Sequence, residues 1–241
     1  MSLLRLDRIL SEYTPLSRRE ATEKIRKGLV LVNRQAARDP SEKYEVQGLL
    51  LSLEGQERRL SLHNSFMLYK PAGVVSATRD ARDTTVLDLI RVQDRYPLLS
   101  PAGRLDKDSE GLMILTSDGG LCHRIISPAS RIFKQYRIRV RGPLGEEHIR
   151  AVAEGIPLSE EELCLPGELM IDYSGECSQA RIRICEGKFH QVKRMMEALD
   201  RPVLSLFRES IGGLVLDETL APGQYRPLDA AEILKIFDRE P

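Results

Sequence analysis

The stretch Ala102–Thr116 reads AGRLDKDSEGLMILT and joins a charged loop directly to an apolar run. The apolar run, Leu112–Thr116, has the length and composition of a buried strand. Three interpretations of the loop before it compete: a polar turn, a calcium-binding loop, and an active site in which a carboxylate lies beside a guanidinium. The charged side chains of this loop are Arg104, Asp106, Lys107, Asp108 and Glu110.

The calcium interpretation fails on spacing. A helix–loop–helix calcium site that began at Asp106 would have ligands at Asp108 and Glu110, which fits the sequence. Its twelfth position must be a bidentate glutamate, and this chain has Ser117 there. A strand also follows where such a site requires a helix, so we exclude calcium.

The polar-turn and active-site interpretations both stay open on these residues alone. Gly, Asp and Ser are ordinary turn residues, which favours the turn. Arg104 stands two positions before Asp106, so in an extended loop both side chains project to the same face. The strand that follows would hold them rigidly, which favours a site.

A second polar stretch, Glu186–Met196, reads EGKFHQVKRMM and predicts an amphipathic helix over 189–199. Lys193 lies away from the apolar face of this helix and stands four positions before Glu197. It therefore forms an exposed ion pair or reaches a buried carboxylate. His190 has no His or Cys at a metal-ligand spacing on the same helix, so we expect it to pack or to face RNA. The apolar face is Val192, Met195, Met196 and Leu199.

The stretch Phe133–Tyr136, FKQY, opens a strand rich in basic residues. Tyr136 either packs in the core or, within a basic patch, stacks on an unpaired base. The net charge is zero, with 36 basic and 36 acidic residues, but the charges are segregated. Residues 119–145 hold six Lys or Arg and no acid, and such a patch matters more to a phosphate backbone than the total does.

The 241 residues have room for a small domain and a larger one. We place the boundary between residues 62 and 63, which gives domains of 1–62 and 63–241. In the first domain a helix is expected over 18–27, with a capping box formed by Ser17 and Glu20. Strands are expected next over 29–33 and 49–53, and a polar linker over 54–59.

The second domain is expected to be α+β, with a mixed, largely antiparallel sheet flanked by helices, because strands and helices do not alternate regularly. The expected strands are 66–69, 112–116, 136–140, 168–173 and 179–185. The expected helices are 85–90, 121–126, 146–154, 189–199 and 229–237.

Composition predicts a cytoplasmic protein. No run of 18 residues is apolar, so we expect no membrane span. The N-terminal segment is interrupted by Arg5, Asp7 and Arg8, which leaves no apolar region for a signal peptide. The four cysteines include no CxxC pair and predict neither disulfides nor a zinc site.

Taken together, these stretches resemble a known family. GRLDKDSEGLMILTSDG, KQYRIRV and EGKFHQVKRMM, in this order, are similar to the catalytic motifs of the ribosomal pseudouridine synthases. FMLYKPAG resembles the opening of their catalytic domain, and RLDRILSEYTPLSRREATEKIRKGLVLVNR resembles the S4 RNA-binding domain that precedes it. The resemblance covers nearly the whole chain and implies an isomerase that acts on ribosomal RNA.

The resemblance also assigns roles to single residues. Asp106 corresponds to the catalytic aspartate, and Arg104 to an arginine that holds the flipped nucleotide. Tyr136 corresponds to the tyrosine packed against the target base. The basic residue paired with the aspartate is Lys193 or Arg194, because the family often has arginine there. Further substrate contacts are expected from Gln191, Arg5, Arg18, Arg19, Lys24 and Lys27.

The implied reaction breaks the bond between N1 and C1′ of uridine, rotates the base and rejoins it through C5. A carboxylate can serve as nucleophile at the sugar or as base toward it, and the uridine must first be flipped out of its stack. The resemblance implies no cofactor and no metal. An apolar lining from Leu112–Thr116 would keep water out.

The C-terminal run FRESIGGLVLDETLAPGQYRPL resembles that of enzymes modifying uridine 516 of 16S rRNA. We therefore expect 16S rRNA as partner, free or in an assembling small ribosomal subunit, and a monomer that binds no membrane. Three alternatives stay open: the same reaction on 23S rRNA, a ribosome-assembly protein that binds RNA without catalysis, and a glycosidase-like hydrolase that uses Asp106 and Asp108.

Overall fold

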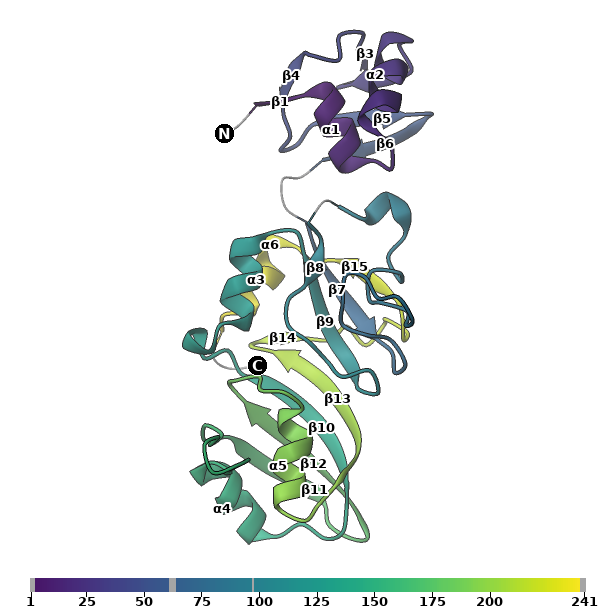
Figure 1. The fold of residues 1–241 in the computed structure, drawn as a ribbon. Helices are drawn as coiled ribbons and strands as arrows, with labels where there is room; N and C mark the ends of the chain where they lie inside the picture. The colour runs from purple at the N-terminus through teal and green to yellow at the C-terminus, as the bar shows by residue number, and fades with distance from the viewer. Residues whose placement is uncertain (1–2, 61–63, 97, 239–241) are drawn as a thin grey trace. The chain divides into compact units, whose positions relative to one another are not determined.

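The computed structural model describes residues 3–60, 64–96 and 98–238 (Figure 1). The chain forms two compact units, Met1–Asn64 with Ile90–Leu99 and Ser65–Leu89 with Ser100–Pro241. The predicted boundary between residues 62 and 63 lies outside the described residues. Within those residues, no helix has the length and apolar character needed to cross a membrane.

The N-terminal unit packs two helices and short strands around an apolar core. The helices are α1 (Leu6–Tyr13) and α2 (Arg18–Arg26). The strands are β1 (Leu3–Arg5), β2 (Val30–Val32), β3 (Gln35–Ala36), β4 (Lys43–Glu45), β5 (Leu50–Leu53) and β6 (Gln56–Arg59). β1 pairs with β4, and β3, β2, β5 and β6 form a sheet in that order. Buried side chains from both helices and from β2 and β5 meet in the core.

Helix α2 begins as the sequence predicts. The hydroxyl of Ser17 accepts the backbone N–H of Glu20 at 3.3 Å, and the Glu20 carboxylate accepts the backbone N–H of Ser17 at 2.8 Å. This reciprocal capping satisfies two donors that would otherwise lack a partner at the helix start.

The polar run 54–59 is not the linker that we expected. Strand β6 occupies most of it and pairs with β5. Glu54 and Gly55 have φ values of 53° and 81°, as the two central residues of a tight hairpin turn require. Glutamate is an unusual residue at such a turn, and this hides the hairpin in the sequence.

A segment from further along the chain completes the N-terminal unit. Its short 3-10 helix is η1 (Val92–Asp94). The ring of Tyr96 meets Tyr13 edge-on with centroids 6.0 Å apart, and the guanidinium of Arg58 lies 4.1 Å over the Tyr96 ring. Edge-on aromatic and cation–π contacts of this kind hold the segment against the core.

The second unit is built on one sheet, with the order β11-β12-β10-β13-β9-β7-β15. β13 runs parallel to β9, and the other pairings among its described strands are antiparallel, which confirms the predicted mixed, largely antiparallel α+β domain. The strands are β7 (Ser65–Lys70), β8 (Ser100–Pro101), β9 (Glu110–Thr116), β10 (Lys134–Arg141), β11 (Glu168–Tyr173), β12 (Cys177–Ile184), β13 (Val203–Ile211), β14 (Leu214–Val215) and β15 (Tyr225–Pro227).

Helices flank this sheet (Figure 1). α3 packs on β9, α4 on β11, α5 on β13 and α6 on β14. Their bounds are α3 (Gly119–Ile126), η2 (Pro128–Ser130), α4 (Glu146–Glu154), α5 (Gln191–Ala198) and α6 (Ala230–Lys235).

Two features of this unit differ from the prediction. The helix expected over 85–90 is absent from this described segment, because the Asp88 carboxylate accepts the backbone N–H and the hydroxyl of Thr85 and so holds a turn instead. Strand β13 is missing from the predicted elements. Its buried face carries Arg208 and Ser210, so the usual alternation of apolar and polar residues is broken.

Candidate active site

The charged loop 102–109 ends where β9 meets β13. Glu110 and Gly111 of β9 pair with Phe207 and Arg208 of β13. Gly111 has a φ of 111°, and a Cβ at this position would lie 2.3 Å from the carbonyl oxygen of Arg208. Glycine is therefore required for the two backbones to approach this closely, and their pairing fixes the C-terminal end of the loop.

Lys70, the last residue of β7, ties the loop from inside the protein. Its side chain is fully buried, and its ammonium donates to the carbonyls of Pro71 at 3.0 Å and Ser109 at 2.7 Å. Burial lowers the pKa of Lys70 to about 8, although the charges of Asp108 and Asp106 oppose this shift. The ammonium thus stiffens the loop and adds positive charge behind its carboxylates.

Arg208 also holds the loop 102–109 in place. Its buried guanidinium donates from Nε to the carbonyl of Leu112 at 2.7 Å and from Nη1 to that of Arg104 at 3.4 Å. The hydroxyl of Ser76 donates to the carbonyl of Leu105 at 2.6 Å. Since buried polar groups are costly unless satisfied, these bonds fix one backbone path for the loop.

The start of α5 brings two nitrogen atoms to Asp106. Nζ of Lys193 lies 3.2 Å from Oδ2 of Asp106 and 2.6 Å from Oδ1 of Asp108. Nε2 of His190 lies 3.3 Å from Oδ1 of Asp106. Burial alone would lower the pKa of Lys193, but the two carboxylates outweigh it and raise this pKa, so the ammonium stays charged at neutral pH. Lys193 therefore contacts the loop carboxylates rather than Glu197.

Two other predicted residues on α5 have partners other than Asp106, although Gln191 lines the cavity beside that aspartate. Nη2 of Arg194 lies 2.6 Å from the carboxylate of Glu162, so Arg194 does not pair with Asp106. Gln191 is buried, and its amide donates to the carboxylate of Glu186 at 2.7 Å. Both side chains hold α5 and the segment before it in place.

A cavity of about 710 Å³ opens beside Asp106. Tyr136 of β10 is 8% exposed and lines it, and the exposed Arg104 lies at the same cavity. Lys134 also lines it, and burial lowers the pKa of this lysine to about 8. Tyr136 and the pair Arg104 and Asp106, predicted from two separate parts of the sequence, are therefore brought together.

The expectation that Leu112–Thr116 lines the site is wrong. These residues are buried because β9 lies between β13 and β7, with both faces covered. The apolar side chains at the cavity come from several other elements, among them Ala102, Ile126, Ile184, Val192 and Leu206.

Comparison with known proteins shows the family to which the chain belongs. Residues 64–198 match the family described as RNA pseudouridylate synthase, and residues 4–48 match the S4 domain. The chain belongs to the RNA pseudouridylate synthases. It is thus an isomerase, with an S4 domain at its N-terminus, as the resemblance implied.

Relatives of this synthase extend over its whole length. Proteins described as ribosomal small subunit pseudouridine synthase A are 40% identical in Pseudomonas aeruginosa, 38% in Vibrio vulnificus and 35% in Escherichia coli. Each alignment covers 97% of this chain and 100% of the relative. A crystal structure of a pseudouridylate synthase, 37% identical, superposes with a TM-score of 0.66 over 97% of this chain and 99% of that one.

Several side chains at the synthase site escape sequence reasoning. Lys70 and Lys134 each occupy the end of a strand, a place where lysine is usually solvated. Arg208 lies in a strand that was not predicted. His190 showed no partner in the sequence because Asp106 is distant along the chain. The quoted motifs KPAG, FKQY and FRES contain Lys70, Lys134 and Arg208, but no local pattern says that they are buried.

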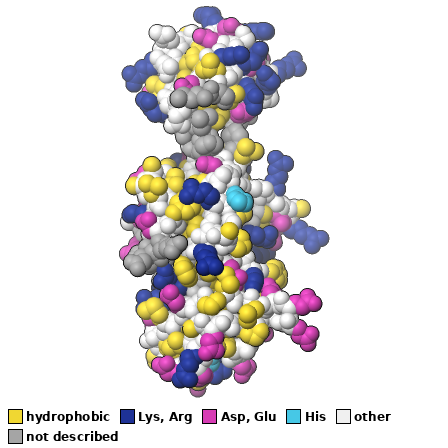
Figure 2. Space-filling model, turned by 90° about the vertical axis from the view of Figure 1, so that its left-hand side faces the viewer, with side chains coloured by type: hydrophobic (Ala, Val, Ile, Leu, Met, Phe, Trp, Pro, Cys, Tyr) yellow, Lys and Arg dark blue, Asp and Glu magenta, His cyan; other side chains and the backbone are white. Residues whose placement is uncertain are grey.

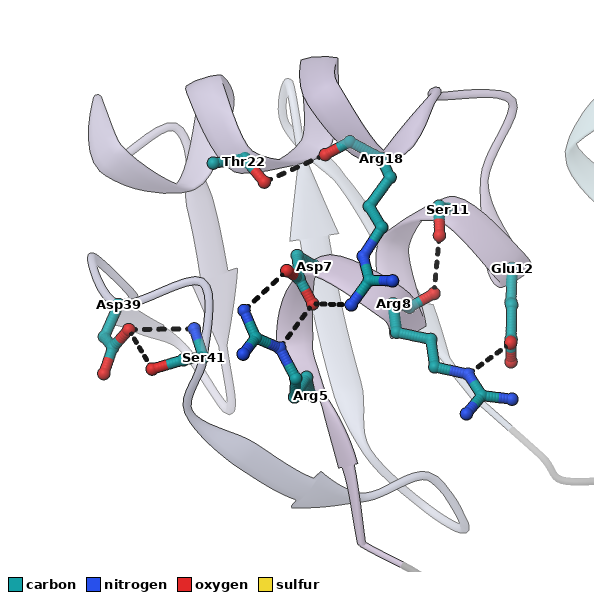
Figure 3. Close-up of polar contacts among 9 residues, drawn as sticks. All are labelled: Arg5, Asp7, Arg8, Ser11, Glu12, Arg18, Thr22, Asp39 and Ser41. Atoms are coloured by element: carbon teal, nitrogen blue, oxygen red, sulfur yellow. Dashed lines mark hydrogen bonds and ion pairs between the residues drawn. The ribbon is translucent and has the colours of Figure 1, made fainter.

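The predicted RNA contacts of the N-terminal unit lie on or near α2. Arg5 and Arg18 both contact Asp7 (Figure 3). Lys24 pairs with Glu54 and Lys27 with Glu23, and the side chain of Arg19 forms no hydrogen bond or ion pair in the described part of the chain.

Replacing Lys70 by Met is expected to loosen the loop. The carbonyls of Pro71, Lys107 and Ser109 lose a buried donor. We therefore expect the free energy of unfolding to fall by roughly 1–3 kcal/mol and the rate of isomerisation to fall about 10-fold or more. Thermal unfolding and single-turnover rates measure these effects. Lys107→Met is the control, since exposed Lys107 pairs with Asp83 at 2.6 Å and should change stability by less than about 0.5 kcal/mol. Equal behaviour of the two variants would contradict the role of Lys70.

Proposed function

We propose that this synthase converts uridine 516 of 16S rRNA to pseudouridine. The observation that carries the proposal is the placement of Asp106 at the cavity, with Lys193 3.2 Å and His190 3.3 Å from its carboxylate oxygens. Full-length similarity to proteins described as small-subunit synthases supports the choice of RNA. We place this activity in the cytoplasm, where bacterial ribosomes assemble.

The site residues divide the reaction among them. Asp106 acts at the sugar, as nucleophile or as base, while the bond between N1 and C1′ breaks. The base rotates within the cavity and C5 bonds to C1′. Where Asp106 had attacked the sugar, its bond to C1′ breaks in this step. Tyr136, against which the base packs, relays the proton from C5 to solvent through its hydroxyl, and N1 takes up a proton. Lys193 and His190 hold the carboxylate oriented, and polar groups fixed in this way act without reorganisation during the reaction.

Reaching the uridine requires that it leave its stack, which costs a few kcal/mol. Arg104 is exposed at the cavity, so its guanidinium can hold the flipped nucleotide. The basic residues of the S4 domain supply phosphate contacts, which provide affinity but carry little sequence information. We propose that the protein works as a monomer, on free 16S rRNA or on an assembling small subunit.

Tritium release tests the proposed function. We would label 16S and 23S rRNA at C5 of uridine, in cells that lack this protein, and incubate each RNA with the purified chain. Isomerisation exchanges the hydrogen at C5, so release from 16S rRNA at a single position, mapped to uridine 516, is the expected result.

Release from 23S rRNA alone would keep the chemistry and overturn the choice of substrate. If neither naked RNA reacts, the same assay on small-subunit precursor particles decides whether the substrate is a ribonucleoprotein. A lack of release from these particles, together with tight binding, would favour a ribosome-assembly role without catalysis.

A further inference from the structure

The N-terminal unit contains a buried carboxylate flanked by two exposed arginines (Figure 3). The side chain of Asp7, in the first turn of α1, is 7% exposed, whereas Arg5 is 45% and Arg18 59% exposed. Arg5 donates from Nε and Nη2 to the two oxygens of Asp7, at 3.2 and 2.9 Å. Nη2 of Arg18 lies 3.4 Å from Oδ1 of the same carboxylate. One acid therefore orients guanidiniums from β1 and α2.

Asp7 is suited to hold these two groups. The hydrogen bonds from Arg5 lower its pKa, against the opposing effect of burial, and Arg18 lowers it further, so the carboxylate stays ionised. Its negative charge is covered by protein, whereas both guanidiniums keep N–H groups that do not contact Asp7. The pair presents these remaining donors to solvent.

The surface around this pair is basic. A shallow depression of about 570 Å³ lies over α2, and Figure 2 shows many Lys and Arg side chains on the visible face of the unit. The side chains of Arg19 and Arg26 form no hydrogen bond or ion pair in the part of the chain that the structure describes. The depression is lined by Asp7, Arg18, Arg19, Thr22, Glu23, Arg26 and Lys27.

We propose that Asp7 is a positioning residue for RNA binding, which holds Arg5 and Arg18 as a preformed pair that binds one phosphate of the substrate RNA. The proposal rests on the proposed function, because it takes RNA as the ligand. Guanidiniums match phosphate oxygens in bidentate geometry, and groups ordered in advance lose less conformational entropy when they bind.

When Asp7 is replaced, an argument from net charge and this proposal predict opposite changes in RNA affinity. Replacing Asp7 by Asn removes a negative charge from a basic face, so long-range electrostatics alone would make RNA binding tighter and more dependent on salt. If Asp7 orders the arginine pair, the same change releases both guanidiniums. Binding then becomes weaker, and the salt dependence of binding falls by the contribution of one phosphate contact.

The experiment measures the dissociation constant of the full chain and a 16S rRNA transcript across a salt titration. Asp7→Asn is expected to weaken binding about 5- to 10-fold and to lower the slope of log K against log salt by about 0.7–0.9. Glu23→Gln is the matched control. It removes an acid from the same depression, but Glu23 contacts Lys27 and not the arginine pair, so binding should be unchanged or tighter.

A double-mutant cycle separates positioning from a structural role. In the Arg18→Met background, Asp7→Asn should have a clearly smaller effect on affinity and on the salt slope, because part of the pair is already lost. Tighter binding with a steeper slope in Asp7→Asn, or Arg18→Met binding like wild type at every salt concentration, would overturn the proposal. Tritium release by the wild type is recorded separately, so a failure of the proposed function is distinguished from a failure of this inference.

Discussion

Asp106→Asn is expected to abolish isomerisation, with tritium release falling by at least about 10⁴-fold. Asparagine keeps the size of the side chain, but it has neither the charge nor the carboxylate oxygens that we propose act at the sugar. The Asp106 side chain is 22% exposed in a loop whose path is fixed by the backbone ties of Lys70 and Arg208. We therefore expect the free energy of unfolding to change by less than about 1 kcal/mol.

Asp108→Asn is the matched control for this prediction. Asp108 also contacts Lys193, but its side chain is 74% exposed, and its loss leaves Lys193 free to pair with Asp106 alone. We expect a rate within about 10-fold of wild type. Both variants are assayed under single-turnover conditions with the same RNA. Equal, complete loss in both would instead support a reaction with two cooperating carboxylates, as in a glycosidase-like hydrolase.

The sequence predicts the parts of this fold in which local pattern and burial agree. The capping box at Ser17, the strand that contains Leu112–Thr116 and the amphipathic helix near Lys193 all occur with bounds close to those expected. Each has a periodic apolar face or a local hydrogen-bond motif, and such signals do not depend on distant residues. That Tyr136 and Arg104 lie at the same cavity was predicted only through the family resemblance.

The missed features depend on contacts between distant residues. Lys70 and Arg208 are buried because they bind carbonyls of a loop that lies elsewhere in the sequence, so they break the rule that charged side chains are exposed. The choice between Lys193 and Arg194 depends on how α5 is rotated toward the loop. Adjacent helical residues point in directions that differ by about 100° around the helix axis. The sequence does not show that Glu162 lies on the side of α5 that carries Arg194.

Lys193→Met is expected to give the second largest loss. Methionine fills a similar volume but removes the ammonium that lies 3.2 Å from Asp106. The loss of one charge-assisted hydrogen bond costs about 1.5–3 kcal/mol, which corresponds to a rate reduced roughly 10- to 150-fold. Because the ammonium orients Asp106 and does not hold the RNA, we expect the loss to fall on the single-turnover rate at saturating enzyme and not on the dissociation constant.

Two further variants decide whether orientation is the cause. Lys193→Arg keeps the charge and should recover much of the rate, although the planar guanidinium meets the two carboxylates with different geometry. Arg194→Met removes the adjacent cation, whose partner is Glu162, and should leave the rate within a few-fold of wild type. A loss in Arg194→Met as large as that in Lys193→Met would mean that overall positive charge on α5 drives the reaction. The contact between Lys193 and Asp106 would then not be its cause.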